Sequence, residues 1–124
     1  MEKYFTASWV LRIGIAGEFI GHGVFALQRK QQWVGWMQQT TGVDSVLATQ
    51  LIFLIGFLDL VVGLSVLVKP MRPVLLWAVF WGFWTAILRP IVGEPIWDFV
   101  ERWANWAAPL ALFILMSKDK NRSR

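Results

Sequence analysis

The sequence predicts an all-α integral membrane protein, an antiparallel bundle of four transmembrane helices. The chain of 124 residues is 56% hydrophobic and contains nine Trp and nine Phe. It holds four apolar stretches, each near the roughly 20 residues that a helix needs to cross the hydrocarbon core. None has the continuous polar face of a soluble-bundle helix, and none alternates strictly as a barrel strand does. Helices that cross a membrane are therefore the interpretation we adopt.

The four helices are expected at about residues 5–27, 46–68, 74–92 and 97–116. A chain of this length has room for one compact unit, so we expect a single transmembrane domain over residues 1–117. The remaining residues, 118–124, form a basic cytoplasmic tail that we expect to be disordered. The connection 28–45 is polar but contains Trp33, Val34, Trp36 and Met37, and we interpret it as a segment lying on the membrane surface.

The positions of Lys and Arg predict the orientation in the membrane. Four crossings put both termini on one side, which carries Lys3, Lys69, Arg72, Lys118, Lys120, Arg122 and Arg124. The other side has fewer basic residues, and positive charge favours the cytoplasm. We therefore expect a multi-pass protein of the bacterial cytoplasmic (inner) membrane, with both termini cytoplasmic. The net charge of +4 then reflects topology and contact with the lipid bilayer, and no nucleic acid is expected as a partner.

Each predicted helix carries one stripe of small and polar residues at steps of three and four, which places them on one helix face. The four stripes are Gly14, Glu18, Gly21, His22 and Phe25; Gly56, Asp59 and Gly63; Gly82, Thr85 and Arg89; and Asp98, Arg102, Asn105 and Ala108. Small residues allow close helix contacts in membranes, and ionisable groups there usually face the bundle interior. The stripes therefore predict one shared polar interior.

Five residues of these stripes are candidates for ligand binding or proton relay: Glu18, His22, Asp59, Arg89 and Asn105. The direction of each helix puts them near the midplane or in the outer half, so we expect them to line one outward-facing polar cavity. Such a site could hold an anion or the carbonyl groups of a quinone and exchange a proton with it. The alternative is that these groups only neutralise one another in a dry, packed interior. No catalytic residue can be assigned.

Structural ion pairs are expected among Arg89, Glu94, Asp98 and Arg102. An arginine beside the hydrocarbon boundary needs a counter-charge, so Arg89 should pair with Glu94, Asp98 or a deep carboxylate. No metal site is predicted, because Cys is absent, His22 is the only histidine, and a Glu18–His22 pair is a weak signal. The absence of Cys also excludes disulfides and cysteine-ligated iron–sulfur clusters.

Tryptophans follow two patterns. Trp9, Trp33, Trp36, Trp97 and Trp103 fall near predicted interfaces, where Trp is common. Trp77, Trp81 and Trp84 form a stripe at steps of four and three. We expect this second stripe to face lipid or a partner subunit rather than a ligand.

Three segments resemble the DoxX-like family of small membrane proteins. They are Leu11–Gly23 (LRIGIAGEFIGHG), Gly56–Leu64 (GFLDLVVGL) and Trp103–Leu112 (WANWAAPLAL). In the second, the family pattern has Glu where this chain has Asp59. The resemblance implies a four-helix membrane fold. Some relatives are subunits of thiosulfate:quinone oxidoreductase and others are associated with sulfur or oxidative-stress enzymes, but no catalytic residue carries over.

Three functions remain open at this point, and so does the question of whether the chain is an enzyme. The first is a small membrane subunit of a redox-linked system, binding a quinone or a small anion in the cavity. The second is a non-enzymatic interaction or scaffold protein, acting as a homo-oligomer or beside a partner redox subunit. The third is a small transporter or channel subunit, which would need an oligomer because four helices leave little room for alternating access. The chain has no Walker loop, dinucleotide fingerprint or nucleophile elbow.

Overall fold

The computed structural model describes the backbone of residues 2–122 and the side chains of residues 7–118, and every regular element in this part of the chain is an α-helix. The helices are α1 (Glu2–Leu27), α2 (Gln31–Thr41), α3 (Ser45–Val68), α4 (Arg72–Ile91), α5 (Ile96–Val100) and α6 (Ala104–Arg122). Three stretches are long and apolar enough to cross a membrane: Ala7–Leu27, Ser45–Val68 and Arg72–Ile91. The all-α prediction is therefore confirmed, together with three of the predicted membrane-compatible helices.

The structure corrects the fourth predicted helix, 97–116, which is divided into α5 and α6. Between them the chain makes tighter turns, in which the amide of Arg102 bonds to the carbonyl of Phe99 at 3.1 Å. The guanidinium of Arg102 donates to the carbonyl of Asp98 at 2.8 Å, so that this carbonyl is not left without a donor. Helix α6 then continues to Arg122, which corrects the expected disordered tail over residues 118–122. Ser123 and Arg124 lie outside the described residues.

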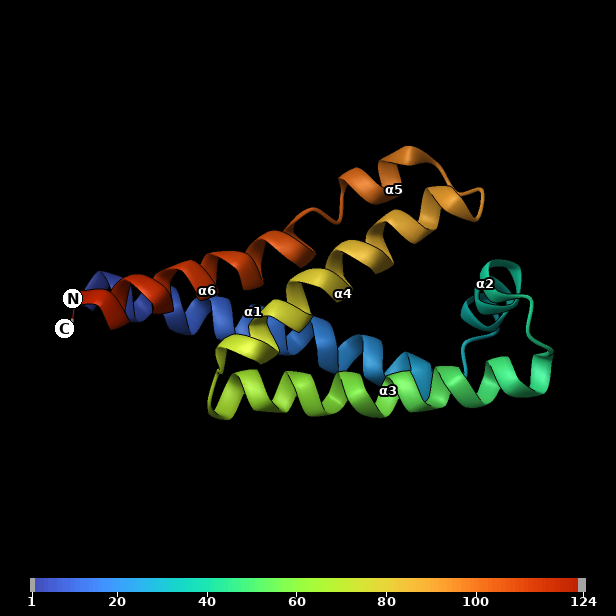
Figure 1. The fold of residues 1–124 in the computed structure, drawn as a ribbon, viewed down its shortest axis with the longest axis horizontal. Coiled ribbons are helices and arrows are strands. Elements are labelled where there is room, and N and C mark those ends of the chain that lie inside the picture. Colours follow the sequence, from blue (N-terminus) through green and yellow to red (C-terminus); the bar gives the residue numbers. More distant parts are fainter. Residues whose placement is uncertain (1, 123–124) are drawn as a thin grey trace.

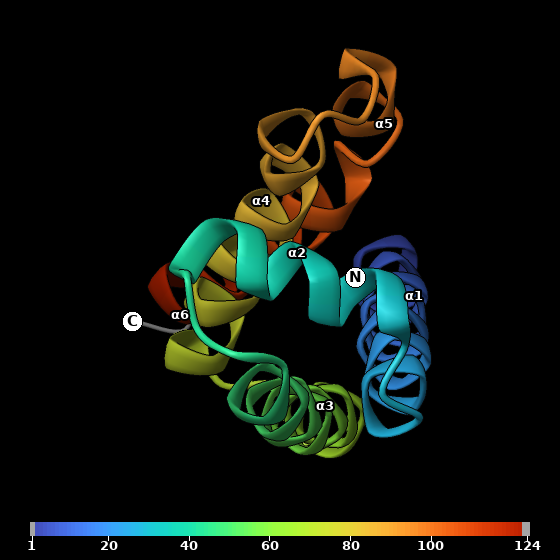
Figure 2. The same ribbon diagram turned by 90° about the vertical axis from the view of Figure 1, so that its right-hand side faces the viewer.

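The long helices form two pairs. Helix α1 packs along α3, helix α4 packs along α6, and α1 also contacts α6. Figure 1 shows the pairs close together where α1 begins and α6 ends, while α4 runs away from α1 and α3 toward the opposite end. We call these the closed end and the open end. In Figure 2, seen from the open end, α2 lies across the front of the other helices.

The closed end holds the main hydrophobic core. Its buried members come from α1, α3, α4 and α6: Ile15, Phe19, Val62, Val66, Leu75, Ala78 and Leu112. Beside this core, the guanidinium of Arg12 donates to the carbonyls of Val66 and Val68, each at 3.2 Å, and to the carbonyl of Leu67. These are the last three carbonyls of α3, which lack partners within the helix. Arg12 therefore ties α1 to the end of α3.

Glycines bring the paired helices into backbone contact. A Cβ on Gly56 of α3 would lie 2.9 Å from the carbonyl oxygen of Gly23, and a Cβ on Gly82 of α4 would lie 2.4 Å from that of Asn105. In contrast, a Cβ on Gly14 or Gly21 would meet nothing within 4 Å. The predicted internal stripe of α1 is therefore wrong at those two glycines.

Candidate functional site

Helix α2 is held over the open end by turns on both sides. At its start, Arg29 adopts a left-handed backbone conformation with φ 55°, and the amide of Lys30 bonds to the carbonyl of Phe25 at 3.3 Å. At its end, Gly42 adopts φ 76° and its amide bonds to the carbonyl of Gln38 at 2.8 Å. These turns reverse the chain twice and lay α2 across the bundle.

The apolar side of α2 faces the protein. Val34 is buried in a small cluster with Ala26, Ala48 and Ile52, and Trp36 is also buried. Trp33 and Met37 are partly buried and pack against the same cluster. A helix is present where the surface segment was predicted, but its apolar residues contact the bundle.

A cavity of about 150 Å³ lies beneath α2, between α1, α3 and α4. An engineered protein cavity of about this size holds one benzene ring. Most of its walls are aromatic or aliphatic, and a few polar side chains interrupt them. The lining includes the charged or titratable side chains of His22, Asp59 and Arg89 and the rings of Trp33, Trp36 and Trp81.

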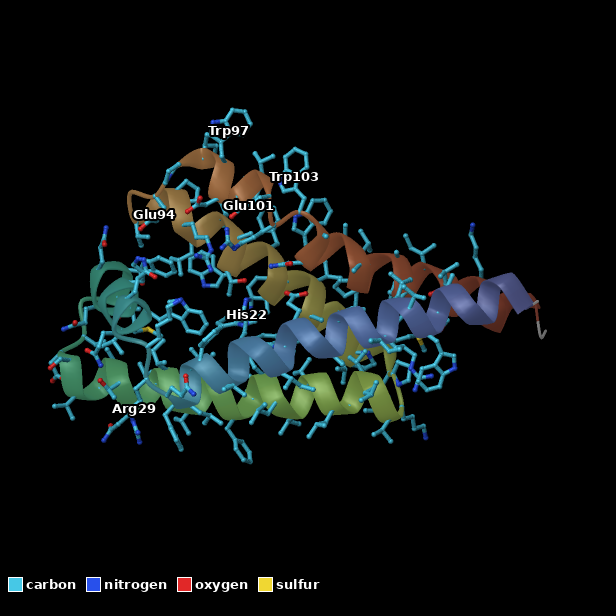
Figure 3. The ribbon with its side chains drawn as sticks, turned by 180° about the vertical axis from the view of Figure 1, so that it is seen from behind. His22, Arg29, Glu94, Trp97, Glu101 and Trp103 are labelled. Carbon is cyan, nitrogen blue, oxygen red and sulfur yellow. The ribbon has the colours of Figure 1, made fainter. Side chains whose placement is uncertain are left out.

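The cavity brings together three of the five candidate residues, His22, Asp59 and Arg89. Figure 3 shows His22 projecting from α1 into the space beside α4. Glu18 and Asn105 do not line the cavity. Glu18 is half-buried next to it and close enough to Asp59 for the two carboxylates to interact electrostatically. The predicted shared site is therefore smaller than the five residues proposed from the stripes.

Asp59 is the most deeply buried polar residue of the described part of the chain. Its side chain is 3% exposed, and its Oδ1 atom has no hydrogen-bond partner among the described residues. A buried polar atom without a partner is costly, and an acid at the membrane centre costs roughly 2.5–3.5 kcal/mol on insertion scales. An arrangement of this kind needs an explanation beyond packing.

Arg89 does not form the predicted ion pair. Among the described side chains, no carboxylate oxygen lies within 4.0 Å of its nitrogens, and its buried Nε has no acceptor. Its guanidinium instead lies over the ring of Trp36, 5.0 Å from the centroid. The ion pair found in the described region joins Arg102 to Glu101 at 2.6 Å. Among the described residues Glu94 and Asp98 form no ion pair within 4.0 Å, so Arg102 pairs as expected but with Glu101 instead of Asp98.

Trp33 contributes a third polar atom without a partner. Its Nε1 is buried and makes no hydrogen bond among the described residues. The ring is held edge-on by His22, with 5.8 Å between the ring centroids, and the ammonium of Lys30 lies 5.1 Å from its centroid. The indole therefore has a defined position in the cavity wall although its N–H bonds to nothing there.

The tryptophan stripe of α4 was assigned to the wrong surroundings. Trp81 and Trp84 line the cavity, while Trp77 packs against the main core and stacks on Trp81 at 5.4 Å. Trp81 lies four residues before Thr85, and Trp84 lies four residues before Leu88, so all four share one region of the helix surface; nothing in the sequence alone shows that this surface faces a cavity rather than lipid. The hydroxyl of Thr85 donates to the carbonyl of Trp81 at 2.9 Å.

No group of three or more His, Asp or Glu side chains that could hold a metal ion is found within the described residues. In comparisons with known proteins, no family model, curated protein or solved structure matches this chain. The site therefore has to be interpreted from its own geometry.

Proposed function

We propose that this chain is a small membrane subunit of a redox-linked system and that the cavity beneath α2 binds the ring of a quinone. The observation that carries the proposal is the unpartnered carboxyl of Asp59 in the wall of a cavity that fits one ring. A buried acid of this kind is retained at a cost, and a ligand that bonds to it offsets that cost.

The other walls suit the same ligand. Ring contacts from Trp36, Trp81 and Trp84 favour a flat, apolar molecule. A quinone ring carries two carbonyl oxygens on opposite sides, and both can only accept hydrogen bonds. Arg89 and Trp33 each offer a buried N–H without an acceptor, and Asp59 donates when it is protonated. The guanidinium of Arg89 and the carboxyl of Asp59, both side chains of the cavity lining, are the donors that we propose for the two oxygens.

Binding of a short-chain benzoquinone to the protein in lipid nanodiscs tests this proposal. A bound quinone should quench the tryptophans of the cavity in a saturable way. Replacing Asp59 with Leu should weaken saturable binding about tenfold, the usual consequence of losing a hydrogen bond to a charged or polar group. Glu94→Gln is the matched control, since Glu94 does not line the cavity. Unchanged saturable quenching in Asp59→Leu would contradict the proposal.

The finer topology is part of the same proposal. The fourth crossing is made by α5 and α6 together, both termini are cytoplasmic, and the membrane is the bacterial inner membrane. Three points support this: α1 begins and α6 ends at the same end of the molecule (Figure 1), basic residues concentrate there, and the motifs resemble DoxX-like proteins. A reporter fused after Arg124 should be active only in the cytoplasm, and activity on the outer side would overturn the orientation.

A second candidate, an interaction or scaffold protein, is favoured by the surface of α5. Trp97 is 72% exposed, and it projects away from the bundle together with Trp103 (Figure 3). Exposed Trp suits a membrane interface or a partner redox subunit. Crosslinking from position 97 in native membranes separates the two, because lipid alone gives no protein adduct.

A further inference from the structure

We infer that the cavity beneath α2 selects an aromatic ring that carries an anionic oxygen group, a carboxylate above all, placed beside Arg89. The inference rests on the proposed function in one respect, namely that a ring enters this cavity. It goes further by assigning a second class of ligand, rings that carry an anionic group, and the residue that recognises the charge.

The first support is the lack of a counter-ion for Arg89. Its Nε is buried without an acceptor, and Glu94, Asp98 and Glu101 influence it only from beyond 4.0 Å. An arginine at the edge of a membrane helix ordinarily pairs with a carboxylate or a backbone carbonyl. A ligand carboxylate supplies this pair and matches the planar guanidinium.

The second support is the sign of charge around the cavity. The only acidic residue in its lining is Asp59, whereas Arg89 is in the lining and Lys30 lies over the ring of Trp33. Arg102 is paired with Glu101 at 2.6 Å, so the charge balance of the lining depends on Arg89, Lys30 and Asp59. This part of the cavity therefore favours an anion.

The third support is the separation of Arg89 from Asp59. Arg89 lies in the last turn of α4, at the open end. Asp59 lies in the interior of α3, away from the start of that helix at Ser45. The cavity is lined by both residues, so it has a basic, shallow side and an acidic, deep side. A ring with a carboxylate at one position and a hydroxyl opposite it satisfies both.

The cavity volume and its aromatic walls limit the ligand further. About 150 Å³ accommodates one ring with small substituents, as an engineered cavity of about this size accommodates benzene. A carboxylate has two oxygens, and both can accept from the guanidinium of Arg89. A small anion without a ring would leave the indole walls without contacts.

Calorimetric titration of the protein in nanodiscs of zwitterionic lipid tests the inference with four probes: benzoate, 4-hydroxybenzoate, benzyl alcohol and acetate. Benzoate should bind about tenfold more tightly than benzyl alcohol, which has a similar shape and no charge, because a charge-assisted bond is gained. The hydroxyl of 4-hydroxybenzoate should add affinity that Asp59→Leu removes. Acetate should bind most weakly.

Arg89→Gln should reduce the affinity for benzoate to that for benzyl alcohol, while Arg89→Lys should keep part of the preference. The matched control is Arg72→Gln, because Arg72 lies at the start of α4 over the ring of Phe113, outside the cavity. If Arg89→Gln does not fold, we compare the affinity for benzoate with that for benzyl alcohol in the unchanged protein and in Arg89→Lys. A ratio that is equal in the two proteins would contradict a role of Arg89 in recognising the charge.

The outcomes separate this inference from the proposed function. Equal binding of benzoate and benzyl alcohol, with the short-chain benzoquinone also bound, overturns the anion preference and leaves the quinone proposal standing. Acetate binding as tightly as benzoate overturns the requirement for a ring. Failure of every ring, the quinone included, overturns both, whereas benzoate binding without quinone binding supports the inference and refutes the proposed function.

Discussion

Two arginines at opposite ends of the bundle have contrasting surroundings. At the closed end, Arg12 of α1 donates to three carbonyls at the end of α3 and lies 3.7 Å from the ring centroid of Trp9. At the open end, Arg89 of α4 has no acceptor for its buried Nε among the described residues and contacts the face of Trp36. The first guanidinium completes a helix end, and the second is available to another molecule.

The same contrast holds for the rest of the two ends. At the closed end, aliphatic side chains of four helices fill the interior around Phe19 and Leu75. At the open end, a separate helix covers a cavity whose walls carry three unpartnered polar atoms, from Trp33, Asp59 and Arg89. Trp77, which packs against the main core, also has a buried Nε1 without a partner, so unpartnered atoms are not confined to the open end. The two ends differ in the charged groups: among the described residues, the buried side-chain atoms of Asp59 and Arg89 lack partners beside the cavity, whereas Arg12 at the closed end is fully engaged.

The largest loss of stability is expected where the backbones of α4 and α6 touch, at Gly82. Gly82→Ala places a Cβ at 2.4 Å from the carbonyl oxygen of Asn105, and two packed backbones have no flexible side chain that can yield. We expect a loss of about 3 kcal/mol of unfolding free energy, at the upper end for overpacked contacts. Denaturant-induced unfolding in detergent micelles measures it.

Gly17→Ala is the control for this variant, since a Cβ there would meet nothing within 4 Å. It makes the same chemical change within a membrane helix and should leave stability unchanged or slightly higher. Equal losses in the two variants would mean that close backbone contact between α4 and α6 is not what makes Gly82 necessary.

The second prediction compares the two arginines directly. Arg12→Leu removes the donor for the carbonyls that end α3 and should cost about 2 kcal/mol of unfolding free energy. Arg89→Leu removes no hydrogen bond within the described part of the chain, so the change should stay under about 1 kcal/mol, the size of its contact with Trp36. Unfolding curves of both variants under one condition give the comparison, and a larger loss for Arg89→Leu would reverse the roles assigned here.

Hydropathy predicted the closed end better than the open end, for a physical reason. The stretches that became α1, α3 and α4 are long apolar runs, and their helical state follows from the need to pair every backbone group in lipid. The buried positions Gly56, Asp59 and Gly63 follow from helical spacing on α3. Each of these features can be predicted from the sequence of a single helix.

The open end depends on features that one helix does not contain. An apolar face such as that of α2, or the stripe of Trp81 and Trp84, suits lipid and an aromatic cavity equally well, so composition cannot distinguish them. The fourth predicted helix is divided into α5 and α6, and the guanidinium of Arg102 donates to the carbonyl of Asp98 at the break. Arg89 lies over the ring of Trp36 and not beside a carboxylate. This contact requires α2 to lie across the bundle, and the two turns at Arg29 and Gly42 set that position.

The smallest expected change in unfolding free energy concerns Asp59, and there we expect a gain and not a loss. A residue that maintains the fold destabilises it when replaced, but Asp59 is buried with an oxygen that bonds to nothing among the described residues. Asp59→Leu replaces this acid with an apolar side chain of similar length and should raise the unfolding free energy by about 1 kcal/mol, as happens when buried ionic groups are replaced by apolar ones. A gain of stability on replacement is the expected sign for a residue that serves the proposed site and not the fold, because activity and stability trade off. The control is Val62→Ala, three residues along α3 in the main core, which should lose about 1–2 kcal/mol through lost contacts. Unfolding of both variants without added ligand measures the two signs. A clear loss in Asp59→Leu would make the carboxyl a structural group of α3, and the contrast between the two ends would then rest on Arg89 and Trp33 alone.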